Sequence, residues 1–149
     1  MGQALPVAIG ACFARPGERV HHVTADGELM MSLAELHTAV RYHLPLTVIV
    51  IVIVLNDHGF GQERHNLTRA GRARDHAAHP TPDLAALAEA MGAVGYRVDG
   101  PDGLHTLKHV LGHRPDEGVI LVDIHVDPGY LNPASAHVAA AMSAGAHGL

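Results

Sequence analysis

Two aspartates, Asp26 and Asp57, each follow a β-rich stretch, and each has a glycine within the next two residues. The stretch before Asp26 is Arg19–Thr24, and the stretch before Asp57 is Thr47–Leu55. Parallel strands joined by a helix deliver their carboxyl ends to one edge of the sheet, where open α/β sheets bind ligands. Carboxylate oxygens are hard ligands. The two positions therefore predict a site for a small divalent cation that holds a phosphate group.

The residues between these aspartates predict a helix followed by a second strand, which is the connection that joins two parallel strands. Between Ser32 and His43, apolar residues recur at helical spacing, and the Leu44-Pro45 pair ends the pattern. The run Thr47–Leu55, TVIVIVIVL, is typical of a strand buried on both faces in a parallel sheet. The rest of the chain predicts helices within residues 1–15, 83–92 and 102–112, and strands at 95–98 and 118–126. Asp83 is expected to begin the second of these helices and Gly92 to end it, and the third is expected to face inward with Leu104, Leu107, Val110 and Leu111. We therefore predict an α/β fold with three layers, a mostly parallel sheet carrying helices on both faces.

Composition limits the classes of function. A chain of 149 residues, nearly half of them apolar, is expected to form one domain with a proper core. A net charge of −5 with only 10 Lys and Arg argues against a nucleic-acid partner. Cys12 is the only cysteine, which fits a reducing, cytoplasmic compartment. The longest apolar run, Val48–Leu55, is too short for a membrane-spanning helix, and we see no signal peptide.

Six segments, in order along the chain, resemble the C-terminal, pyrophosphate-binding domain of thiamine diphosphate-dependent enzymes of the acetolactate synthase and 2-oxoacid decarboxylase group. They are MGQALPVAIGA (Met1–Ala11), ADG (Ala25–Gly27), ELHTAVRYHLP (Glu35–Pro45), NDHGFG (Asn56–Gly61), DLAALAEAMGAVGYRV (Asp83–Val98) and GVILVDIHVDP (Gly118–Pro128). The resemblance implies that residues 1–130 form this domain. Residues 131–149 are expected to be an Ala-rich, weakly ordered tail.

The resemblance also implies the site. In such enzymes Mg²⁺ joins the cofactor's diphosphate to the protein, and the ligands match the side chains of Asp26 and Asp57 and the main-chain carbonyl of Gly59. Met1 matches an apolar residue that props the cofactor in its bent conformation, and Gly27 allows the backbone to approach the diphosphate. The other residues expected at the cofactor are Ala25, Asn56, Phe60 and Gly61.

Two departures from the family pattern affect this site. Ala25 replaces the usual first glycine, so its methyl group could crowd the cofactor. The strand at residues 47–55 carries about four extra residues, roughly 13 Å of strand. If the strand overhangs near Pro45, Asp57 still reaches Asp26. If the overhang falls at the other end, the metal site is broken.

A third departure concerns the rest of the enzyme. The family's catalytic glutamate belongs to a separate pyrimidine-binding domain of a partner subunit, and the family's first strand precedes the position of Met1. The resemblance therefore implies an N-terminally truncated fold, either a subunit of a split enzyme or a fragment, which works within a homo- or hetero-oligomer. The expected activity is that of a lyase or transferase acting on a small 2-oxoacid. The alternative is a non-catalytic remnant or interaction module that keeps the fold without a working site.

Other polar residues receive mainly structural interpretations. His105, His109 and His113 are spaced for one helix face, but without a carboxylate or thiolate at a recognised zinc spacing they indicate a solvated face. We expect Cys12 to be a core residue and His22 to face the core as a hydrogen-bonded side chain. Two further residues, His58 and Gln62, lie beside the expected cofactor and leave a substrate or proton-transfer role open.

Overall fold

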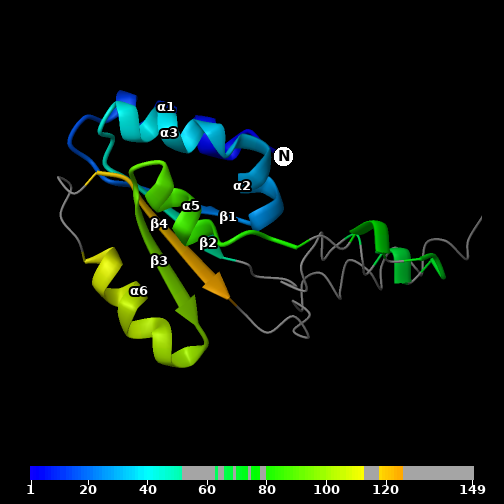
Figure 1. Ribbon diagram of the computed structural model, residues 1–149. Coiled ribbons are helices and arrows are strands. Elements are labelled where there is room, and N and C mark those ends of the chain that lie inside the picture. Colours follow the sequence, from blue (N-terminus) through cyan, green and yellow to red (C-terminus); the bar gives the residue numbers. More distant parts are fainter. Residues whose placement is uncertain are drawn as a thin grey trace, which may run out of the picture.

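The computed structural model describes residues 1–51, 63, 66–68, 70–73, 75–77, 80–112 and 118–125. Its centre is a four-stranded sheet in the order β1-β2-β4-β3, with every adjacent pair parallel (Figure 1). The strands are β1 (Val20–Thr24), β2 (Leu46–Ile51), β3 (Val94–Asp99) and β4 (Ile120–His125). All four carboxyl ends therefore lie at one edge of the sheet, as the α/β prediction requires.

Helices cover both faces of this sheet (Figure 1). One face carries α1 (Ala4–Ala14), α2 (Asp26–Ser32), α3 (Ala34–Arg41) and α5 (Leu84–Ala90), and the other carries α6 (Leu104–Leu111). Two short 3-10 turns, η1 (Asp75–Ala77) and η2 (Pro101–Gly103), complete the described elements. The predicted three-layer arrangement is confirmed. Among the described residues, no helix combines the length and apolar character needed to cross a membrane.

The strand β4 shows why the sheet needs both helical layers. Leu121 joins the core beneath α1, α3 and α5, whereas Ile120, Val122 and Ile124 join the core beneath α6. Successive side chains of a strand point to opposite faces, so an unbroken apolar run has to be covered on both sides. Each fully buried Leu or Ile contributes about 1.5–3 kcal/mol.

The helix α5 begins and ends as predicted. At its start, the Asp83 carboxylate accepts a hydrogen bond from the main-chain N–H of Ala86, at 2.9 Å. At its end, Gly92 adopts a left-handed conformation with φ +88°, and the N–H of Ala93 donates back to the carbonyl of Ala88. A glycine adopts this conformation without steric cost.

The close approach of α5 to β3 depends on Gly95. A Cβ at this position would lie 2.2 Å from the carbonyl oxygen of Ala85 and 2.8 Å from its carbonyl carbon. Only a residue without a side chain allows the helix and the strand this separation. Gly95 thus fixes α5 against the sheet, and with it the segment that enters α5.

The prediction that four apolar residues of α6 face inward is half wrong. Val110 is fully buried and Leu107 is partly buried, but Leu104 is 58% exposed and Leu111 is 45% exposed. Residues 101–103 form the turn η2, so the helix starts at Leu104, two residues later than predicted. An eight-residue helix presents a single narrow stripe to the sheet, and Leu107 and Val110 fill it at i, i+3 spacing.

Cys12 is confirmed as a core residue. Its side chain is 2% exposed, and its Sγ lies 4.0 Å from the carbonyl oxygen of Pro45. Burial raises the pKa of the Cys12 thiol, which keeps the sulfur in its neutral, poorly nucleophilic form.

Candidate functional site

Asp26 lies at the carboxyl edge of the sheet, where the sequence predicts it. It is the first residue of α2, two residues after the end of β1, and it is only 6% exposed. One carboxylate oxygen, Oδ1, accepts the main-chain N–H of Gly27 at 2.8 Å, and Oδ2 accepts the hydroxyl of Thr81 at 2.8 Å. Both donors are uncharged, so neither neutralises the carboxylate, and each oxygen retains a further lone pair. This buried oxygen pair fits a hard cation such as Mg²⁺.

The Ala25-Asp26-Gly27 sequence predicts a turn after the first strand, and the structure differs from this prediction. Ala25 is extended, with φ −101° and ψ 160°, and caps α2, whereas Asp26 and Gly27 are already helical. Any residue adopts the Ala25 conformation, so the backbone does not require the glycine of the family pattern at this position. The helical crossover is also longer than predicted, because α2 and α3 follow each other through Leu33, whose backbone is helical.

The register of β1 and β2 decides where the extra residues of the second strand lie. Val20 pairs with Leu46 and Thr24 pairs with Val50, so β2 begins level with β1 and does not overhang at Pro45. The register therefore leaves no overhang before Leu46 for the predicted extra residues. The predicted site residues Asn56, Asp57, Gly59, Phe60 and Gly61, together with His58 and Gln62, lie outside the described residues.

A second polar cluster occupies the same edge at the ends of β3 and β4, and sequence reasoning missed it. His125 Nε2 lies 3.0 Å from Asp123 Oδ2, and His125 Nδ1 lies 3.6 Å from Asp99 Oδ1. The cross-strand register pairs Arg97 with Asp123 and Asp99 with His125. Burial raises the pKa of Asp123, and the nearby His125 opposes this rise. The hydrogen bond from Arg97 Nε, at 2.9 Å, holds the pKa of Asp99 below its usual value.

The signal for this cluster is present in the sequence. Asp123 and His125 are two residues apart within an otherwise apolar strand, so they share one face of it. The signal for Thr81 is much weaker, because a threonine between Pro80 and Pro82 reads only as the entry to a helix. Its contact with Asp26, which is 55 positions earlier, is visible only in the fold.

Comparison with known proteins identifies this arrangement. Residues 1–124 match the family described as "Thiamine pyrophosphate enzyme, C-terminal TPP binding domain". The chain belongs to this family.

Relatives of the thiamine pyrophosphate-binding domain include the acetolactate synthase isozyme 3 large subunit of Escherichia coli K12, 35% identical over 130 residues. Those residues are 85% of this chain but 22% of the relative. The acetolactate synthase of Bacillus subtilis is also 35% identical, over 128 residues, with 85% of this chain and 21% of the relative covered. The domain is thus that of acetolactate synthase-like enzymes, and the chain spans about a fifth of their length.

The fold of the thiamine pyrophosphate-binding domain is also similar to that of a solved structure. It is the thiamine diphosphate-dependent 4-hydroxybenzoylformate decarboxylase of Rhodococcus jostii RHA1. The TM-score is 0.70 at 25% identity, over 85% of this chain and 23% of that chain.

Two other predictions about this binding domain concern its N-terminus and its histidines. Met1 is 76% exposed, and the N-terminus lies beside α2 (Figure 1). Neither observation tests the role of Met1 at the cofactor, which stays a prediction.

His105 and His109 are exposed on α6, which confirms the solvated face at these two positions, whereas His113 lies outside the described residues. The described part of the chain contains no group of three His, Cys, Asp or Glu side chains able to hold a metal.

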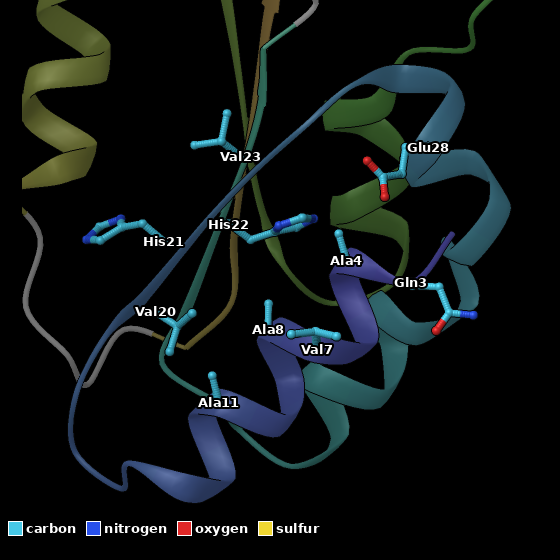
Figure 2. Close-up of a pocket in the computed structure, with 10 residues that line it drawn as sticks. All are labelled: Gln3, Ala4, Val7, Ala8, Ala11, Val20, His21, His22, Val23 and Glu28. Atoms are coloured by element: carbon cyan, nitrogen blue, oxygen red, sulfur yellow. The ribbon is translucent and has the colours of Figure 1, made fainter. Parts of the chain in front are cut away.

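A pocket of about 530 Å³ lies between α1, β1 and α2 of the binding domain (Figure 2). None of the residues predicted to bind the metal ion lines this pocket. His22 points from β1 toward α2 and Glu28, whereas the neighbouring His21 points away (Figure 2). His22 is 8% exposed, and its buried Nε2 has no hydrogen-bond partner among the described residues. The expected core position is therefore confirmed, but no partner is found for Nε2. Burial lowers the pKa of His22, and Glu28 partly opposes this effect.

The buried His22 predicts a pH dependence of stability. Because its pKa is lower in the folded state than the usual 6.5, the unfolded chain binds the additional proton as pH falls below 6.5. The free energy of unfolding should therefore decrease from pH 7 to pH 5, and His22→Leu should weaken this decrease. Urea denaturation across this range measures it, with the exposed His21→Leu as control. Equal slopes for the wild type and His22→Leu would contradict the assignment.

Proposed function

We propose that this chain binds the diphosphate of thiamine diphosphate through Mg²⁺ held by Asp26, Asp57 and the main-chain carbonyl of Gly59. The observation that carries the proposal is the buried carboxylate of Asp26 at the carboxyl edge, fixed by two uncharged donors. Membership of the thiamine pyrophosphate-binding family supports the choice of cofactor. The bound cofactor would stabilise the carbanion formed when a 2-oxoacid loses carbon dioxide.

The residues of this chain hold and orient that cofactor. Asp26 offers a hard oxygen ligand whose orientation is set before the cation arrives, which reduces the ordering cost of binding. Ala25 is exposed at the end of β1, beside this ligand. We assign Met1, Gly27, Asn56, Phe60 and Gly61 to the surroundings of the cofactor.

The assignment of Asp57 places a requirement on the chain that precedes it. Asp26 follows Thr24 by two residues, whereas Asp57 follows Val50, the register partner of Thr24, by seven. A strand that continued without interruption would carry Asp57 about 16 Å beyond the level of Asp26, at about 3.3 Å per residue. For Asp57 to be a ligand, the segment after Val50 therefore has to turn back toward β1.

We also propose that the remaining parts of the active site come from another domain or subunit. The relatives are between four and five times longer than the stretch they share with this chain, which leaves room for a pyrimidine-binding domain with a catalytic glutamate. In this proposal the assembly is a homo- or hetero-oligomeric lyase or transferase acting on a small 2-oxoacid in the cytoplasm. The family match over residues 1–124 and the retained Asp26 favour a binding domain. The observation on the side of the alternative, a non-catalytic remnant, is the register of β1 and β2, which excludes an overhang near Pro45.

Calorimetric titration tests the proposed binding. Thiamine diphosphate added to the chain should give binding heat in the presence of Mg²⁺, and this heat should disappear when EDTA removes the cation. Circular dichroism of the same sample establishes that the chain is folded. A folded chain that binds the cofactor equally with and without Mg²⁺, or not at all, would contradict the proposal.

A further inference from the structure

The hydroxyl of Thr81 is the only side-chain donor that the described residues place on the Asp26 carboxylate. It donates to Oδ2 at 2.8 Å, and the main-chain N–H of Gly27 donates to Oδ1 at the same distance. A carboxylate bonded at one oxygen only can still rotate about its Cβ–Cγ bond. With a donor on each oxygen, the plane of the Asp26 carboxylate is fixed.

The Thr81 hydroxyl is itself held by a rigid segment. Pro80 and Pro82 flank Thr81, and the ring of each proline fixes one backbone dihedral angle. Asp83 follows and caps α5 through the N–H of Ala86. Since α5 packs closely on β3 at Gly95, the position of the Thr81 hydroxyl is determined by the sheet rather than by a free loop.

From these contacts we infer that Thr81 is a positioning residue for the cation, acting through Asp26. This inference rests on the proposed function and extends it to a residue on another element. Thr81 and Gly27 each use one lone pair of the Asp26 carboxylate and leave one lone pair of each oxygen for the cation. Partners of this kind around a metal ligand typically alter metal affinity 10–100-fold when they are removed. The bond also joins the first residue of α2 to the segment that enters α5.

The test compares Thr81→Val, which keeps the shape of the side chain but removes the hydroxyl, with Thr81→Ser, which keeps the hydroxyl. The measurement is the Mg²⁺ concentration that gives half-maximal binding of thiamine diphosphate, followed by calorimetry. We expect this concentration to rise about 10–100-fold in Thr81→Val and to stay near the wild-type value in Thr81→Ser. The urea midpoint of the cofactor-free chain, measured in parallel, establishes that each variant is folded under the conditions of the titration.

The outcomes separate this inference from the proposed function. If the wild type shows no cation-dependent binding, the proposed function itself fails. If the wild type binds and Thr81→Val has the same Mg²⁺ requirement, or if Thr81→Ser is as weak as Thr81→Val, the hydroxyl has no positioning role. Should Thr81→Val not fold, Thr81→Ala removes the same hydroxyl without a second branch on Cβ and is compared with Thr81→Ser in its place.

Discussion

Replacement of Asp26 by alanine is expected to abolish cation-dependent binding of thiamine diphosphate, with a loss of affinity greater than about a hundredfold. This exceeds the 10–100-fold range usual for residues that only support a ligand, because Asp26 is assigned as a ligand itself. Its carboxylate is also buried, so water cannot easily supply the missing oxygen. Calorimetry with and without Mg²⁺ measures the effect. The control is Asp102→Ala, which removes an exposed carboxylate of η2.

The Asp57→Ala variant extends this test to the second ligand. If the segment after Val50 turns back toward β1, Asp57→Ala should lose cation-dependent binding as Asp26→Ala does. Wild-type affinity in Asp57→Ala, together with loss in Asp26→Ala, would mean that another oxygen completes the site. Wild-type affinity in Asp26→Ala would contradict the assignment of the first ligand.

The second large effect is expected from Gly95→Ala, which should lower the free energy of unfolding by about 3 kcal/mol or more, at the upper end of the range for overpacking. The new methyl group would meet the carbonyl oxygen of Ala85 at 2.2 Å, and the three nearest atoms, all from Ala85, are main-chain atoms that cannot rotate away. To relieve the contact, α5 has to move off the sheet. Urea denaturation of the cofactor-free chain measures the change.

Gly10→Ala is the matched control for this substitution. Gly10 lies within α1, and a Cβ there meets no atom within 4 Å. Alanine is favoured over glycine in a helix, so Gly10→Ala should stabilise the chain by about 0.5–1 kcal/mol. A Gly95→Ala chain within about 0.5 kcal/mol of the wild type would show that α5 and β3 are not in the described contact.

The sequence predicted the elements whose patterns are local. The β-branched run after Pro45 predicted β2, and Asp83 and Gly92 predicted the two ends of α5 through capping and a left-handed conformation. Both signals act within a few residues. The inward face of α6 was predicted less well, because the 3-10 turn at residues 101–103 shifts the helix start, and burial of Leu104 depends on how far the sheet extends beneath it.

The candidate site was predictable only where topology places a residue directly. Asp26 follows β1 and has to reach the carboxyl edge, so its position follows from the parallel order of the strands. The contact of Thr81 with Asp26 joins elements that are distant in the sequence, and no local pattern encodes it. The length of the run at residues 47–55 did not reveal at which end the extra residues lie. The pairing of Val20 with Leu46 excludes an overhang at the Pro45 end.

The most direct test of the cation site is the anomalous scattering of Mn²⁺, a hard cation that can replace Mg²⁺, in crystals of the chain grown with thiamine diphosphate. The predicted result is an anomalous peak within coordination distance of the Asp26 carboxylate, about 2.1 Å, with diphosphate oxygens completing the coordination. Cofactor bound at the carboxyl edge with no cation at Asp26, or an Mn²⁺ peak elsewhere on the chain, would contradict the account.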